Sequence, residues 1–210
     1  MSRLVDVPLG APPTPLPRRV RDLLDDADDR IERFQQAHLQ APVPAFVPCD
    51  FVEVYHGLQQ VAAANLAPGH KFCEWGSGVG AVTCLASLLG FDAVGIEIEP
   101  DLVEAALALA DDHGIDAELV RGSFVPYGGD DCLDAHAAEL DREVTWLRTD
   151  GEDAYEELGL DPDDFDVVFA YPWPGEEEVI FDLFAEFAAV GALLLTHHGE
   201  NGTRLQRKKR

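Results

Sequence analysis

Basic residues are scarce in this chain of 210 residues: 15 Lys and Arg stand against 40 Asp and Glu, which gives a formal net charge of −25. The imbalance is greatest in residues 41–203, which hold only four of the basic residues. A surface this negative repels phosphate groups, so the body of the protein is not expected to bind nucleic acid or an anionic membrane.

Cysteine is also rare, and Cys49, Cys73, Cys84 and Cys132 form no C-x-x-C pair. That spacing argues against a zinc site or a disulfide framework, so we expect no metal and a reducing cytoplasm. No apolar run approaches the roughly 20 residues that a membrane-spanning helix needs. The first 17 residues have no apolar core of the signal-peptide type.

Residues 1–17 are rich in proline and predict an extended lead-in. Apolar residues then recur at helical spacing, which predicts helices over 18–40 and about 50–65. We interpret 18–66 as an N-terminal helical cover that precedes the main domain.

Short apolar runs and helical segments alternate after residue 67. Strands are expected at 71–75, 93–97, 117–120, 166–170 and 192–196, and helices at 80–89, 100–113, 131–143 and 176–189. Alternation of this kind predicts an α/β domain with a doubly wound, mainly parallel sheet over residues 67–199. Residues 200–210 carry five basic residues, and we expect them to form a basic C-terminal tail.

The segment Phe72-Cys-Glu-Trp-Gly-Ser-Gly-Val-Gly80 joins a predicted strand to a predicted helix. Closely spaced glycines allow a ligand to approach the backbone, and a helix N-terminus offers unpaired N–H donors. Glu97 ends the next strand, at the distance expected of an acid that binds ribose hydroxyls. The spacing also fits a dinucleotide-binding loop, but Glu74 would lie poorly beside a pyrophosphate and suits a cationic amino-acid end.

The pattern E-x-G-x-G-x-G, followed by Val94-Gly-Ile-Glu-Ile98, resembles the first two motifs of class I S-adenosylmethionine-dependent methyltransferases. The resemblance implies a Rossmann-like fold and S-adenosylmethionine as cofactor. It implies that Glu74 lies near the methionine moiety, that Glu97 binds the ribose and that Ile98 lies against the adenine. Many members carry an Asp after the third strand, where this chain has Ser123. The cofactor-binding residues implied are Glu74, Gly76, Ser77, Gly78, Gly80, Glu97, Ile98, Ser123 and Phe124.

The family's sheet has seven strands, whereas the patterns of this chain predict five. We therefore expect the C-terminal strand hairpin of the methyltransferase fold to be missing in part. A weaker resemblance, over about residues 46–125, is to small lysine methyltransferases of the Dot1-like and FAM173-like type.

The exit of the fourth predicted strand is the acceptor side of this fold. Its Ala170-Tyr-Pro-Trp173 lacks the amide or carboxylate of the amino-methyltransferase motif that it resembles in position. Tyr171 and Trp173 are candidates for an aromatic wall, and His197 for a general base at the end of the last strand. The acceptor stays unidentified; a lysine-bearing protein would suit an acidic body. A non-catalytic binding protein and a NAD-dependent oxidoreductase remain as alternatives.

Overall fold

The computed structural model describes residues 3–10, 13–40, 46–140, 151, 153–173 and 175–210. They form a seven-stranded sheet of order β1-β7-β6-β5-β2-β3-β4, parallel except that β7 runs antiparallel to both neighbours. The strands are β1 (Arg3–Asp6), β2 (Lys71–Trp75), β3 (Asp92–Glu97), β4 (Glu118–Arg121), β5 (Val167–Ala170), β6 (Leu193–His197) and β7 (Thr203–Lys209). The doubly wound α/β fold expected from the sequence is therefore confirmed.

The central strands form because their residues are apolar on both faces of the sheet. In β2, Cys73 faces the cluster formed with the helices of one layer, and Phe72 faces the opposite cluster. In β5, Val168 belongs to the same cluster as Cys73, and Val167 belongs to the same cluster as Phe72. Parallel strands covered on both faces read as continuous hydrophobic runs, and the five predicted strands agree with β2 to β6 to within a residue.

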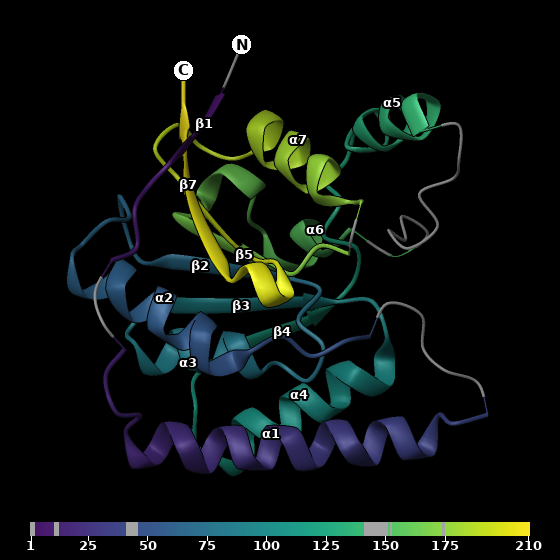
Figure 1. The fold of residues 1–210 in the computed structure, drawn as a ribbon. Helices are drawn as coiled ribbons and strands as arrows, with labels where there is room; N and C mark the ends of the chain where they lie inside the picture. Colours follow the sequence, from purple (N-terminus) through teal and green to yellow (C-terminus); the bar gives the residue numbers. More distant parts are fainter. Residues whose placement is uncertain (1–2, 11–12, 41–45, 141–150, 152, 174) are drawn as a thin grey trace.

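Helices cover both faces of the sheet (Figure 1). One face carries α2 (Phe51–Ala63), α3 (Ala81–Leu88) and α4 (Pro100–Asp112); the other carries α5 (Asp130–Leu140), α6 (Ala154–Leu158) and α7 (Glu177–Phe187). The long helix α1 (Arg18–Ala37) packs on α3 and α4 as an additional outer layer. Its apolar positions Leu23, Ala27 and Ile31 are buried there, so α1 stabilises the sheet through α3 and α4.

The count of five strands is too low, because β7 follows β6 and pairs antiparallel with it, with Leu195 opposite Leu205. A single strand follows β6, and the seventh strand of the sheet is β1 from the N-terminal segment, so the expected partial loss of the C-terminal hairpin agrees with the structure. Residues 203–209 of the predicted basic tail are thus a strand of the sheet. Leu205 is fully buried, and Lys208 places its alkyl stem in the protein while its ammonium donates hydrogen bonds to the carbonyls of Glu186 and Ala188. The hydrophobicity pattern did not predict this strand because most of its residues are polar or basic. The alkyl stem of a basic side chain can be buried while its charged end hydrogen-bonds to backbone carbonyls.

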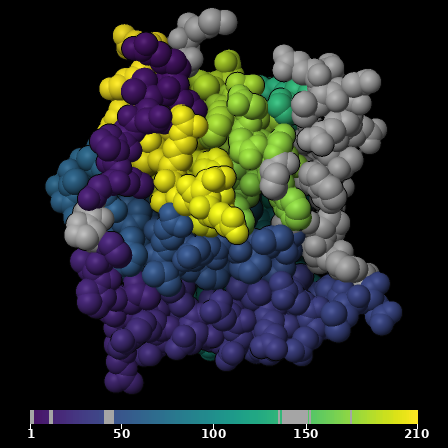
Figure 2. All heavy atoms as spheres, in the orientation of Figure 1, coloured from purple at the N-terminus to yellow at the C-terminus, as the bar shows by residue number. Residues whose placement is uncertain are grey.

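Part of the proline-rich lead-in over 1–17 belongs to the sheet. Arg3–Asp6 form β1, which pairs antiparallel with β7, with Leu4 opposite Lys208. In Figure 2 the purple N-terminal segment lies beside yellow β7, and green α7 lies on the other side of β7. Segments from the two ends of the sequence therefore complete this edge of the sheet.

Candidate active site

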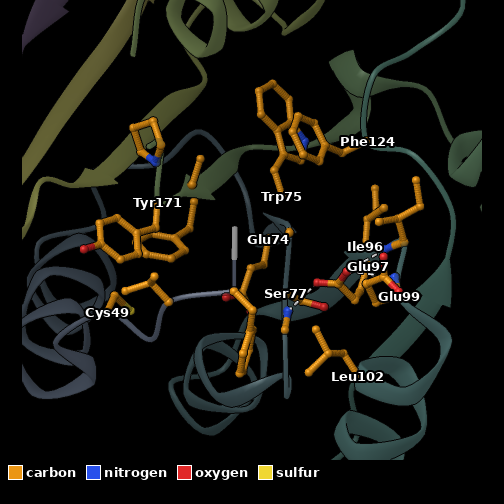
Figure 3. A pocket seen from close by; sticks show the side chains of 18 of the residues that line it. Cys49, Glu74, Trp75, Ser77, Ile96, Glu97, Glu99, Leu102, Phe124 and Tyr171 are labelled. Carbon is orange, nitrogen blue, oxygen red and sulfur yellow. Dashed lines mark hydrogen bonds between the residues drawn. The ribbon is translucent and has the colours of Figure 1, made fainter. Parts of the chain in front are cut away.

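A cavity opens at the carboxyl ends of β2, β3, β4 and β5, where the chain leaves the sheet in four loops (Figure 3). Its floor is the glycine loop after β2, and its walls come from the ends of β3, β4 and β5. The segment 46–51, which precedes and opens α2, lies across it from outside the sheet. Ligands of open α/β sheets bind at this position, where the strand order reverses.

The glycine loop is held close to β3 by backbone hydrogen bonds. Gly76 and Ser77 donate their N–H groups to the carbonyl of Ile96 over 3.0 and 2.9 Å. Gly76 and Gly78 have φ of +74° and +54°, conformations that L side chains rarely adopt. Gly76 lines the cavity, and a Cβ placed on it would meet no atom within 4 Å. The loop therefore leaves space for a ligand against its backbone.

Gly80 has a different role from the other two glycines. It caps the N-terminus of α3 with a φ of +74° and is not among the residues that line the cavity. A Cβ at Gly80 would lie 2.8 Å from the Cβ of Ala106 and 3.2 Å from Cδ1 of Leu119. Gly80 is therefore required for α3 to pack against α4.

Glu97 ends β3 with its carboxylate turned back to the glycine loop (Figure 3). Its Oε2 accepts the N–H of Gly78 over 2.8 Å, and its Oε1 accepts those of Ile98 and Glu99 over 2.8 and 2.9 Å. The side chain is only 8% exposed, and burial raises the pKa of this carboxyl although the three N–H groups oppose the shift. The carboxylate is thus fixed on the lining of the cavity by backbone groups alone.

Glu74 lies beneath the loop and is almost fully buried. Its Oε2 accepts the backbone N–H of Thr83 over 2.7 Å and the Thr83 hydroxyl over 2.5 Å, in the first turn of α3. Burial is the largest influence and raises the pKa of Glu74 to about 8; the bonds from Thr83 lower it, and the charge of Glu97 raises it. Glu74 therefore both stabilises the start of α3 and brings a carboxyl group to the cavity.

An aromatic pair forms the wall beside β4. Trp75 and Phe124 stack with ring centroids 5.3 Å apart and planes within 6° of parallel. Ser123, which lines the cavity, accepts the N–H of Val125 with its Oγ over 3.1 Å. Ile98 also lines the cavity, so this end presents an apolar and aromatic surface.

The three residues proposed for the acceptor side occupy two different environments. Tyr171 and Trp173 line the cavity after β5, whereas His197 is not among the lining residues. The His197 ring lies edge-to-face with Tyr171 at 5.0 Å, its Nε2 accepts the N–H of Asp50, and its Nδ1 is 3.8 Å from Glu53. Burial lowers the pKa of His197. The ring therefore supports Tyr171 from behind and does not face the cavity.

Two features of the described residues bear on other classes of function. One group of three acids is close enough together to hold a metal ion, the exposed Asp161, Asp163 and Asp164, and it lies outside the cavity lining. Among those same residues, no helix combines the length and the apolar character that crossing a bilayer needs.

Comparison with known proteins adds the fold family. No family model matches the chain. A ribosomal protein L11 methyltransferase from Thermus thermophilus is 35% identical over 82 residues, which are 37% of this chain and 32% of that protein. This chain thus matches about a third of the length of that curated relative. A solved methyltransferase from Geobacter sulfurreducens is 16% identical with a TM-score of 0.50, over 98% of this chain and 100% of that one. The fold is that of the class I S-adenosylmethionine-dependent methyltransferases.

A second solved structure, an RNA methyltransferase from Salinibacter ruber in complex with S-adenosyl-L-homocysteine, has 19% identity and a TM-score of 0.49, over 80% of this chain and 93% of that one.

Phe46, Cys49 and Glu176 are among the lining residues that sequence reasoning missed. Phe46 lies across the glycine loop, 3.1 Å from where a Cβ of Gly78 would stand, and Cys49 follows it in the same segment. No local pattern marked these two, because they reach the cavity only through the packing of α1 and α2. Glu176 starts the helix predicted over 176–189, where an acid needs no functional explanation; it is buried and lines the cavity.

Proposed function

We propose that this protein binds S-adenosylmethionine and transfers its methyl group to an acceptor held at the end of β5. One observation carries the proposal: the carboxylate of Glu97 accepts the backbone N–H of Gly78, a residue of the glycine loop, and both residues line the cavity. A carboxylate at the end of the second strand of such a sheet is placed to bind ribose hydroxyls. The clear space against Gly76 gives the cofactor room above the loop.

The residues around the cavity fit the parts of this cofactor. Glu97 would bind the ribose, and Ile98 and Phe124 would lie against the adenine, with the hydroxyl of Ser123 beside it. Glu74, beneath the loop, would pair with the cationic amino-acid end, because a buried carboxyl gains most from a partner of opposite charge. The backbone of Gly76, Ser77 and Gly78 would lie against the cofactor between these two ends.

The bound cofactor would supply a methyl group already activated by its sulfonium sulfur, so the protein's contribution is orientation. Tyr171 and Trp173 form the wall at which the acceptor would meet that methyl group. His197 would act through Tyr171, since its ring packs on Tyr171 and its Nε2 is engaged by the backbone of Asp50.

Calorimetry of the full chain with S-adenosylhomocysteine, S-adenosylmethionine and NAD tests the proposal. We expect both sulfur ligands to bind and NAD to fail; tight NAD binding without a response to S-adenosylhomocysteine would overturn the assignment. Transfer of a labelled methyl group from the cofactor into a cell lysate separates an enzyme from a binding protein. We expect Trp173→Ala to lower that transfer, and an equally active variant would remove Trp173 from the site.

A further inference from the structure

Helix α1 belongs to the outer layer of the fold (Figure 1), yet one of its residues reaches the cavity. Ile31 of α1 lines the cavity together with Val79 of the glycine loop and Leu102 of α4. These three residues are buried in one apolar cluster, and Phe46 packs against this cluster and lines the cavity as well. The cavity therefore has an apolar end that is built partly by α1 and by the chain that follows it.

Phe46 is the aromatic residue of this apolar end. Its Cε2 lies 3.1 Å from where a Cβ of Gly78 would stand, so the ring lies against the backbone of the glycine loop. The N–H of the same Gly78 donates to Oε2 of Glu97 over 2.8 Å. The ring therefore stands at the end of the cavity where Glu97 would bind the ribose of the cofactor.

Two rings at the end of α1 support Phe46. Phe34 and Phe46 meet edge to face, with ring centroids 5.0 Å apart and planes at 68°. Phe34 is buried in the last turn of α1, and the ring of His38, which caps that helix, stacks on it with centroids 4.2 Å apart. Rings in these geometries attract one another beyond the area that they bury. The three rings thus connect the end of α1 to the glycine loop.

His38 also joins α1 to α4. Its Nδ1 lies 2.9 Å from the carbonyl oxygen of Phe34, and its Nε2 lies 3.3 Å from Oδ2 of Asp101, in the first turn of α4. Both partners accept hydrogen bonds, so only a ring with a proton on each nitrogen donates to both of them. Asp101 is the acid that faces the ring from α4, while Arg33 of α1 lies 3.6 Å from Asp26. The arrangement therefore suits a protonated His38.

A second histidine–aspartate pair joins the same two helices at the end of α4 that is remote from the cavity. Nε2 of His113, which follows α4, lies 3.1 Å from Oδ2 of Asp26 on α1. Asp101 and His113 stand at opposite ends of α4, whose 13 residues span about 20 Å. The two pairs share their chemistry, but only the pair of His38 lies beside the rings that reach the glycine loop.

We propose that Phe46 is a cofactor-contacting residue that closes the cavity at the ribose, and that Phe34 and His38 are positioning residues that hold Phe46 there. This inference rests on the proposed methyltransferase function. The ring of Phe46 would shield the carboxylate of Glu97 from water, and a hydrogen bond from a ribose hydroxyl to that carboxylate is stronger where water is excluded. Protonated His38 keeps the end of α1 on α4, so the affinity for the cofactor depends on a charge outside the cavity lining.

The contact is tested by calorimetry of the full chain with S-adenosylhomocysteine. We expect Phe46→Ala to lower the affinity about tenfold, and Phe46→Leu, which keeps most of the apolar bulk, to lower it about threefold or less. Val52→Ala is the control, because Val52 is exposed, lies six residues further along the chain and is not among the residues that line the cavity. Urea denaturation of each variant shows that it folds.

The positioning role is tested with His38→Gln, and His113→Gln is the matched control because it removes the equivalent pair between α1 and α4. Affinity is measured at about pH 5.5 and about pH 8.5, on either side of the range in which histidines change charge. We expect the ratio of the wild-type affinity to that of His38→Gln to be about threefold larger at the lower pH, and the ratio for His113→Gln to stay near one. The ratio cancels the titration of Glu74, which all three proteins share. Phe34→Leu keeps a buried apolar side chain but loses the ring, and it should lower the affinity at both pH values.

The outcomes separate the two proposals. Equal affinities of wild type and Phe46→Ala overturn the contact with the cofactor, and an unchanged affinity in Phe34→Leu overturns the role of Phe34. A ratio for His38→Gln that does not change with pH, or that His113→Gln reproduces, overturns the positioning role of His38. In each of these cases the wild-type chain still binds S-adenosylhomocysteine and the cofactor assignment stands. Failure of the wild-type chain to bind S-adenosylhomocysteine overturns the methyltransferase function itself.

Discussion

The backbone N–H of Gly78 donates a 2.8 Å hydrogen bond to Oε2 of Glu97, and this bond joins the loop after β2 to the end of β3. The two residues are 19 positions apart in the sequence, yet the parallel pairing of β2 and β3 brings their strand ends to the same edge of the sheet. One carboxylate therefore shapes the loop and faces the ligand space that the loop encloses.

Glu97→Gln is expected to lower the affinity for S-adenosylhomocysteine about tenfold or more, a loss of about 1.4 kcal/mol. The amide replaces one acceptor oxygen by an NH₂ group, which cannot accept the N–H bonds that the carboxylate holds. Asp92→Asn, at the exposed opposite end of β3, is the control and should bind normally. Calorimetry measures both, and unchanged affinity in Glu97→Gln would contradict the ribose assignment.

Two glycine substitutions should differ in what they impair: Gly76→Ala mainly cofactor affinity, and Gly80→Ala mainly stability. Gly76→Ala meets no atom but adds a methyl group at the cavity, so we expect a loss of cofactor affinity and a stability cost of about 1–2 kcal/mol from its positive φ. Gly80→Ala carries the same φ penalty and in addition collides with Ala106, which should cost about 1–3 kcal/mol more. Chemical denaturation and calorimetry of both variants check this. Equal losses of stability would show that the packing of Gly80 is not tight.

Glu74 should make the stability of the protein depend on pH. Its pKa of about 8 in the folded protein lies above the ordinary 4.5, so the folded state keeps a proton that the unfolded chain releases. The stabilising contribution is then fully present below pH 4.5 and is lost as the pH rises through 8. Between these values the free energy of unfolding of wild type should fall with pH relative to that of Glu74→Gln.

Thr83→Val is the control for that measurement. It removes the hydroxyl bond that lowers the pKa of Glu74 and leaves the carboxyl in place, so the dependence on pH should persist. Parallel stability curves for wild type and Glu74→Gln would show that Glu74 keeps an ordinary pKa.

His197→Gln is expected to reduce kcat by less than about tenfold and to leave the pH–rate profile unchanged, whereas loss of a general base costs about 10²–10⁴-fold. The reason is geometric: Nε2 accepts the N–H of Asp50, and the ring lies behind Tyr171. A pH–rate profile of the two proteins measures the effect. A loss above 100-fold together with a missing acidic limb would make His197 the base after all.

Lys208→Met should lower the free energy of unfolding by about 2 kcal/mol, because the carbonyls of Glu186 and Ala188 lose their donor at a buried position. Lys209→Met removes the same charge from the exposed next residue and should be close to neutral. Urea denaturation of the pair measures the difference. Equal stabilities would mean that Lys208 is held by its stem alone.

The sequence predicted the elements that depend on local pattern. The apolar runs of β2 and β5 and the helical spacing of α1 determine which segments are strands and helices, and the structure confirms them. The sequence predicts that the glycine loop and Glu97 bind a ligand, because a strand, a turn of small residues and a helix follow one another within one short stretch and Glu97 ends the next strand. For Gly80, by contrast, the sequence motif predicts a cofactor contact, whereas the short distance to Ala106 shows that Gly80 lies in the packing of the helices.

The amino-acid sequence by itself determined the mainly parallel sheet, the succession of its central strands and helices along the chain, and the glycine loop at the carboxyl edge where the cavity lies. Only the tertiary structure decided that β1 and β7 complete the sheet, that Glu176 is buried at the cavity and that His197 lies behind Tyr171. Patterns of hydrophobicity report which residues avoid water within one segment. They do not report which distant segment covers a strand edge or a charged side chain, because that depends on contacts between residues far apart in the chain, such as Leu4 beside Lys208.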